Sequence, residues 1–181
     1  MTEFLNNLNS PSLITLLIAM LPIAELRGAI PIAILKYHLP VWKSVLIAMI
    51  GNLLPVIPLL IFLEKMLDVF SKWRPTKKLV AKLIERTKSR SKVIEQYKIM
   101  GLAIFVGIPL PITGAWTGSL ASVILGMKFF HALIGIIIGV CIAAVIVTTL
   151  TLLGKLGGIL AGCGLIGFLI FTFLQRIKHA K

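Results

Sequence analysis

The sequence predicts an all-α, polytopic membrane protein with two opposed re-entrant hairpins, arranged as an inverted repeat, and about three full transmembrane helices. The 181 residues are 58% apolar and only 14% charged, and their mean hydropathy is +1.02, which exceeds what a soluble core of this size requires. Several apolar runs reach the roughly 20 residues that cross a bilayer. Two of these runs are interrupted near their middle by prolines, which is typical of re-entrant segments.

The first apolar segment, residues 12–35, carries two charges where a membrane segment normally has none. Glu25 and Arg27 lie near its centre, between Pro22 and Pro31. A charged side chain at mid-bilayer costs about 2.5–3.5 kcal/mol on insertion scales, so such residues usually face a cavity or a partner. Because prolines on both sides disfavour a continuous helix, we expect a broken hairpin. Broken apolar segments with ionisable groups are typical of transporter sites, and this segment therefore predicts a transporter.

The next two segments also contain helix-breaking residues. Residues 44–63 carry no charge and should form a kinked spanning helix, since two prolines and a glycine interrupt them. Residues 99–127 are broken in the middle by Pro109 and Pro111, which predicts the second re-entrant hairpin.

The last two segments are expected to be spanning helices, at residues 129–154 and 156–175. The whole chain is then one integral membrane domain. Its predicted parts are a first repeat (12–63), a basic cytoplasmic segment (64–98), a second repeat (99–154) and a final transmembrane helix (156–175).

The charge distribution predicts the topology. Eleven of the nineteen Lys and Arg residues lie between Lys65 and Lys98, which places that segment on the cytoplasmic side and suits a helix lying on anionic lipid head groups. The basic C-terminus should be cytoplasmic too, so an even number of crossings must follow residue 98. A re-entrant hairpin and two spans satisfy this condition. The same placement argues against nucleic acid as a partner.

The two broken segments share a pattern of residues. Pro22-Ile-Ala with Gly28 parallels Pro111-Ile-Thr with Gly118, and Gly51 in the following helix parallels Gly139. One crossing separates the two hairpins, so they would enter from opposite faces of the membrane and meet near its midplane.

Glu25 and Arg27 are the leading candidates for a substrate or ion site. Glu25 can act as a protonatable carboxylate that couples transport to protons or binds a cationic group. The alternative is an ion pair with Arg27 that only holds the hairpin together. Arg27 can hold a phosphate or a carboxylate, because its planar fork suits both anions.

Three further polar residues are candidates for the same site. Thr113 and Trp116 lie at the tip of the second hairpin, and Asn52 is either a structural tie or a ligand. The residues expected to shape the hairpins are Pro22, Gly28, Pro31, Pro109, Pro111, Gly114 and Gly118.

Several classes of function are excluded or disfavoured. The chain has no Walker loop, no nucleophile–base pair and no paired carboxylates, so we expect neither an enzyme nor a cofactor. Its two cysteines and three histidines have no metal-ligand spacing, so no metal site is expected. Small residues at four-residue spacing allow close helix packing, including a contact within a homodimer.

The residues at the two breaks resemble the signatures of the small multi-drug export protein family of bacteria and archaea. These are Pro22-Ile-Ala-Glu-Leu-Arg-Gly-Ala-Ile-Pro31 and Gly107-Ile-Pro-Leu-Pro-Ile-Thr-Gly-Ala-Trp-Thr-Gly118. The resemblance implies drug efflux from a prokaryotic cell. Together with the broken segments, it predicts a secondary transporter, proton- or ion-coupled, that moves a small amphipathic substrate across the cytoplasmic (inner) membrane.

The layout is also similar to that of the DedA superfamily, which implies a flippase for lipids or lipid-linked phosphates as the alternative. The chain departs from the DedA pattern because it has no arginine in its second hairpin, between Lys98 and Lys128. A membrane scaffold that transports nothing is the third alternative. It would bind its partners through the basic segment.

Overall fold

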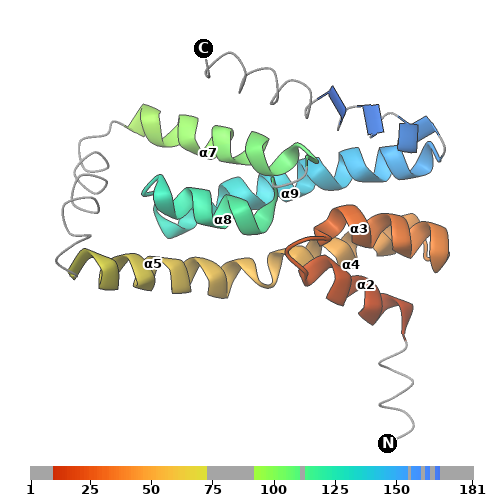
Figure 1. The fold of residues 1–181 in the computed structure, drawn as a ribbon, viewed down its shortest axis with the longest axis horizontal. Coiled ribbons are helices and arrows are strands. Elements are labelled where there is room, and N and C mark those ends of the chain that lie inside the picture. The colour runs from red at the N-terminus through yellow and green to blue at the C-terminus, as the bar shows by residue number, and fades with distance from the viewer. Residues whose placement is uncertain are drawn as a thin grey trace, which may run out of the picture.

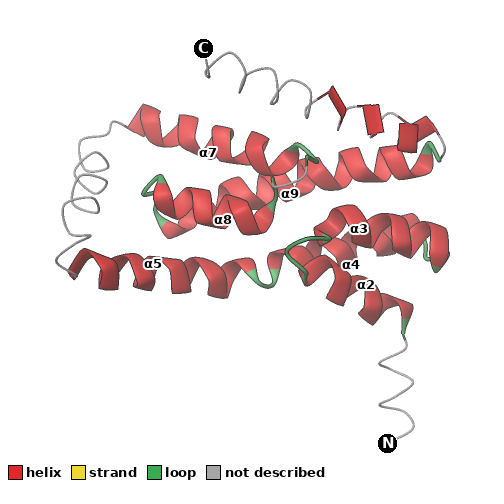
Figure 2. Cartoon of the chain, in the orientation of Figure 1, coloured by secondary structure: helices red, strands yellow, loops and turns green. Residues whose placement is uncertain are grey.

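The computed structural model describes residues 10–72, 92–110, 113–154, 156–159, 162–163 and 166–167, and these residues form helices and loops without strands (Figures 1 and 2). The elements are α2 (Pro11–Met20), α3 (Glu25–Pro31), the π-helix η1 (Ile32–Lys36), α4 (Val41–Leu53), α5 (Val56–Lys72), α7 (Lys92–Gly107), α8 (Ala115–Ile124) and α9 (Phe129–Leu152). The all-helical prediction is therefore confirmed. Most of the basic segment and of the predicted final helix lie outside the described residues.

The first break, defined as residues 21–24, separates α2 from α3. Leu21 is extended, and Pro22 has no N–H with which to continue the helix. Glu25 reopens the helix with a positive φ of 48°, a conformation that residues other than glycine rarely adopt. The chain thus turns back on itself immediately before the two charges.

Pro31, which the sequence predicted as a residue that shapes the hairpin, does not end the helical run. It is the last residue of α3, and the chain continues through η1, where the Tyr37 N–H donates to the Ile32 carbonyl at 3.1 Å. A π turn is a common way for a helix to accommodate a local irregularity. The chain leaves the helix only after Lys36 and turns into α4.

The second break, defined as residues 108–114, separates α7 from α8. α7 ends at Gly107, and α8 begins at Ala115 directly after Gly114. Pro111 lies outside the described residues. In Figure 1 both breaks lie near the middle of the molecule. From the first break α2 and α3 both extend toward one end of the molecule, and from the second break α7 and α8 both extend toward the other end.

Among the described residues, two stretches are long and apolar enough to cross a membrane, Val41–Leu63 with 23 residues and Phe129–Leu152 with 24. The first is made of α4 and the start of α5, which are separated by a turn at Leu54 and Pro55, as the predicted kink requires. At 1.5 Å per residue, either helix is about 35 Å long and matches the hydrocarbon thickness.

The helices pack in a reciprocal pattern. Each short helix that follows a break contacts two long helices: α3 packs on α4 and α9, and α8 packs on α9 and α5. The helix that precedes each break packs on the long helix of its own half, so α2 packs on α4 and α7 packs on α9. If α4 and α5 are taken together as the long helix of the first half, exchanging the two halves of the chain leaves this set of contacts unchanged.

Two glycines allow the same close approach in the two halves. A Cβ on Gly51 of α4 would lie 2.6 Å from the carbonyl oxygen of Leu16 in α2, and one on Gly139 of α9 would lie 2.8 Å from that of Ala103 in α7. Both carbonyls belong to a residue four positions before the end of its helix. In both cases a side-chain atom three residues further along is also within 2.9 Å of the added Cβ.

Candidate functional site

Glu25 lies at the meeting point of the two breaks. Its side chain is 5% exposed, and the backbone N–H of Trp116 donates to Oε1 at 3.3 Å. The N–H of Ala115 is a second backbone donor to the same carboxylate. These two residues begin α8, and the N-terminus of a helix favours a negative charge. The carboxylate of the first half is therefore held by the first turn of a helix from the second half.

Gly114 allows this approach. A Cβ at position 114 would collide with both carboxylate oxygens of Glu25. Only glycine leaves room for the carboxylate beside the backbone here. The sequence predicted Gly114 as a hairpin-shaping residue, and the structure adds this direct contact.

Arg27 binds the backbone of the second break. One guanidinium nitrogen donates to the carbonyl of Leu110, and the other donates to the carbonyl of Thr113 and, at 3.2 Å, to its Oγ1. The Thr113 hydroxyl also lies 2.7 Å from the carbonyl oxygen of Ile108 and 2.9 Å from that of Leu110. Arg27 thus donates hydrogen bonds to carbonyl oxygens of a segment that is not helical, where backbone N–H groups of a helix would otherwise have been the donors.

Trp116 makes the reverse connection. Its indole N–H donates to the carbonyl of Met20, the last residue of α2, at 3.2 Å. The first half therefore contributes two charged side chains and the Met20 carbonyl to this contact. The second half contributes the indole of Trp116 and backbone N–H and carbonyl groups.

Glu25 and Arg27 do not form an ion pair with each other in the described part of the chain. Arg27 binds carbonyls of the second break instead, and Glu25 binds the first turn of α8. An ion pair that merely holds the first hairpin together does not describe this geometry. Their charges still interact through space, because they are two residues apart on α3.

Asn52 is buried on α4 with 1% exposure, and neither Oδ1 nor Nδ2 has a hydrogen-bond partner in the described structure. A buried amide without partners costs about 1–3 kcal/mol by mutational measures. The residue that follows the matching Gly139 is Val140, which is also buried and apolar. The structural tie that the sequence allowed for Asn52 therefore finds no partner among the described residues.

The other predicted hairpin-shaping residues lie where the chain packs or turns. Pro22 is exposed in the first break, and Pro109 is half-buried in the second. A Cβ on Gly28 would lie 3.1 Å from that of Ala24, and one on Gly118 would collide with Val106. Gly28 and Gly118 are each the fourth residue of their helix.

The sequence did not identify the main-chain groups of the site, which are the carbonyls of Met20 and Leu110 and the N–H groups at the start of α8. No side-chain pattern marks such groups, because every residue carries them. The nearest signal was the position of the prolines and glycines that interrupt the helices. The described residues contain no group of His, Cys, Asp and Glu side chains that could hold a metal ion.

The helices and the contact between the two breaks indicate the class of protein. It is an all-helical integral membrane protein whose two chain breaks meet between helices long enough to cross a bilayer. The sequence model of the family described as "Putative small multi-drug export protein" matches residues 25–146. The chain belongs to this family, as the residues of its two breaks predicted. The matched region starts at Glu25 and includes the whole second break, and the family's name indicates a transporter. No curated protein and no solved structure matches the chain.

Proposed function

We propose that the protein is a secondary transporter that moves a small amphipathic substrate across the cytoplasmic membrane, coupled to protons through Glu25. The observation that carries the proposal is the buried Glu25 carboxylate, which is bonded across the two breaks to the first turn of α8. Ionisable residues at membrane depth are expensive and generally mark an ion or substrate pathway.

The architecture we propose for this transporter is an inverted repeat with two re-entrant hairpins, α2–α3 and α7–α8. It is supported by the reciprocal packing of the two halves and by the matched contacts of Gly51 and Gly139. The predicted span at residues 156–175 would return the C-terminus to the cytoplasmic side, where the basic segment would lie on anionic lipids. Small residues at four-residue spacing would allow a homodimer.

The coupling step follows from the charge on Glu25. When ionised, the carboxylate is attracted by the N–H groups at the start of α8 and holds the two breaks together. Protonation removes that charge, so the bond across the breaks weakens while Arg27 keeps its carbonyl partners. The two halves can then rock about the contacts that Arg27 and Trp116 still make, as alternating access requires.

Proton flux into liposomes tests this proposal. The full chain is reconstituted with a pH-sensitive dye inside, and chain-matched anionic, cationic and zwitterionic amphiphiles are added outside. We expect at least one of them to drive proton movement in the wild type, and Glu25→Gln to abolish that movement while remaining folded. Thr15→Val is a suitable control, because its buried hydroxyl bonds only the Pro11 carbonyl of its own helix at 2.7 Å.

The remaining alternatives give different results in the same assay. Unchanged flux in Glu25→Gln would contradict proton coupling through this residue. A wild type that moves none of the amphiphiles would contradict the transporter and favour the scaffold. Movement of labelled lipid between leaflets, lost in Arg27→Ala, would favour the lipid flippase.

A further inference from the structure

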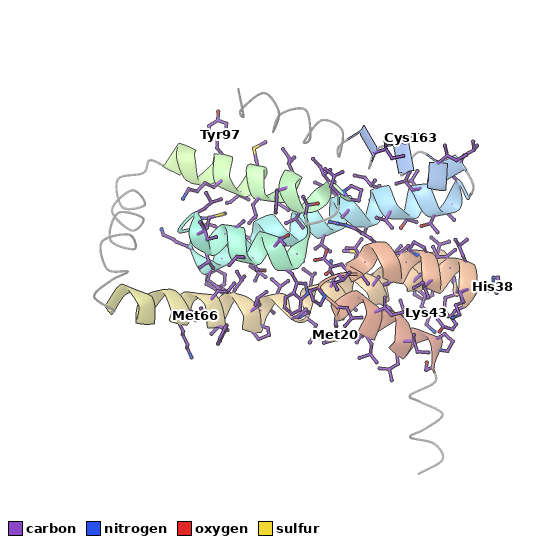
Figure 3. All side chains as sticks on the ribbon, in the orientation of Figure 1. Met20, His38, Lys43, Met66, Tyr97 and Cys163 are labelled. Atoms are coloured by element: carbon purple, nitrogen blue, oxygen red, sulfur yellow. The ribbon has the colours of Figure 1, made fainter. Side chains whose placement is uncertain are left out.

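The charges at the centre of the molecule come from Glu25 and Arg27. Of the helices packed against α3, α2 carries no ionisable side chain, and α4 and α9 carry Lys43 and His131 in their first turns. Figure 3 places Lys43 beside His38 at the end of the molecule away from Tyr97. Cys141 of α9 is exposed, and η1 ends with Lys36, which is also exposed. The nearest charge to Glu25 is therefore Arg27 on its own helix.

This count gives the site a net charge that depends on one proton. With Glu25 ionised, the carboxylate and the guanidinium balance, and the centre is neutral. With Glu25 protonated, the guanidinium of Arg27 remains and the centre carries one positive charge. Its hydrogen-bond partners at Leu110 and Thr113 are neutral, so the guanidinium then has no negative charge beside it, and in an apolar interior it attracts an anion strongly.

The groups around the Glu25 carboxylate are those that an anion needs. The carboxylate is held by two backbone N–H groups of α8 and has Arg27 as its nearest charge. A cation in the same place would meet the N–H groups of Ala115 and Trp116 and the guanidinium, and all of these repel it. Glu25 thus fills a site built for a negative group, with its own side chain as the occupant.

We propose that the substrate of this transporter carries an anionic head group, a phosphate or a carboxylate, which binds Arg27 and the first turn of α8 when a protonated Glu25 leaves that position. The inference rests on the proposed function and specifies its substrate class. Arginine suits both head groups because its planar fork bonds two oxygens at once. One proton and one negative charge would bind together, so the loaded site is as neutral as the empty one.

Thermal unfolding of the purified full chain in neutral detergent tests the charge preference. The ligands are dioctyl phosphate and its chain-matched cation dioctyldimethylammonium, and both keep their charge between pH 5 and pH 8. Dimethyl phosphate presents the same head group without the chains. A ligand that binds the folded state raises the apparent melting temperature according to its affinity and concentration.

We expect dioctyl phosphate to stabilise the wild type at low pH and the cation to have no effect. Because each bound anion requires one proton, its affinity should fall about tenfold per pH unit above the range in which Glu25 ionises. Stabilisation by dioctyl phosphate alone would identify an amphiphile as the source of the head group. Stabilisation by dimethyl phosphate as well would identify a soluble anion. Both results support the anionic class.

Variants at the two charges separate binding from folding. Glu25→Gln should bind dioctyl phosphate with an affinity that no longer depends on pH. Arg27→Lys keeps the charge but loses the fork, so its affinity should fall about tenfold or more, as one lost bidentate bond implies. Lys43→Gln removes a distant cation and should leave the affinity unchanged. If Arg27→Lys does not fold, the Glu25→Gln result decides alone.

The inference fails if the cation stabilises the protein better than the anion, or if anion affinity in the wild type is independent of pH. Either result can occur while the proton flux assay still succeeds, in which case transport stands and the anionic class does not. If the flux assay also fails for every amphiphile, the proposed function fails with it.

Discussion

The two breaks at the centre of the molecule contribute different chemistry to one contact. The first break is followed by two charged side chains, Glu25 and Arg27, at the first and third positions of α3. The corresponding positions of α8 are Ala115 and Thr117, which carry no charge. The second half contributes backbone groups instead, which are N–H groups of α8 and carbonyls of the second break. The two halves share a pattern of helix contacts, but they do not share this chemistry. An identical pair of carboxylates would repel each other at this depth, so one half supplies the charges and the other supplies the dipoles.

The largest expected effect comes from removing the guanidinium. Arg27→Ala loses the bonds to the carbonyls of Leu110 and Thr113 and leaves the Glu25 charge without its nearest cation. We expect the free energy of unfolding to fall by about 3 kcal/mol, because hydrogen bonds to charged groups are among the strongest single interactions. Chemical unfolding in detergent measures it.

The matching position of the second half sharpens this comparison. Thr117 bonds only the Gly114 carbonyl of its own helix, at 3.4 Å, so Thr117→Ala should change stability by less than about 0.5 kcal/mol. Equal losses for Arg27→Ala and Thr117→Ala would show that the two halves contribute alike and would contradict the asymmetry.

The second break should not tolerate a methyl group at Gly114. Gly114→Ala places a Cβ against both oxygens of Glu25, so the carboxylate must leave the first turn of α8. We expect a loss of about 2 kcal/mol, which is the cost of a buried charged group that loses its donors. Proton flux should fall as well.

A second glycine provides the control for this substitution. A Cβ at Gly101 in α7 meets nothing within 4 Å, so Gly101→Ala should gain about 0.5–1 kcal/mol from helix propensity. A Gly114→Ala protein as stable as the wild type would mean that Glu25 does not occupy this position.

Asn52 provides a test of an unpaired group in the first half. Asn52→Leu replaces a buried amide that has no described partner with an apolar side chain of similar size. We expect thermal unfolding to show a gain of about 1–2 kcal/mol. The reverse change at the matching position, Val140→Asn, should lose a similar amount. A destabilised Asn52→Leu would show that the amide has a partner.

Apart from the control substitutions, the smallest effect is expected for the indole of Trp116, which links α8 to α2. Trp116→Phe keeps an aromatic ring but loses the N–H bond to the Met20 carbonyl. A neutral hydrogen bond contributes about 1 kcal/mol, and the same unfolding measurement should show a loss of that size. A loss in the free energy of unfolding as large as that of Arg27→Ala would show that the indole stabilises the contact as much as the charged side chains do.

The sequence predicted much of this arrangement because its signals were strong. Charges at Glu25 and Arg27 within an apolar run, and prolines and glycines near the middle of two runs, located both breaks. The sequence did not show that one π turn lets the helix continue past Pro31 to Lys36. The partners of the two charges could not be predicted, because they are main-chain groups 83 or more residues away from Arg27 and Glu25 in the chain. Nor could the sequence show that Asn52 lacks a partner, which depends on how the helices pack.

The central claim is that ionised Glu25 holds the two breaks together. It can be tested by measuring the distance between spin labels at Ile23 in the first break and Leu120 in α8, both of which are exposed. Cys141 and Cys163 are first replaced by serine. The account predicts one narrow distance distribution at high pH and a longer, broader one at low pH. Glu25→Gln should show the low-pH distribution at every pH. A distribution that stays the same at both pH values and in the variant would contradict the account.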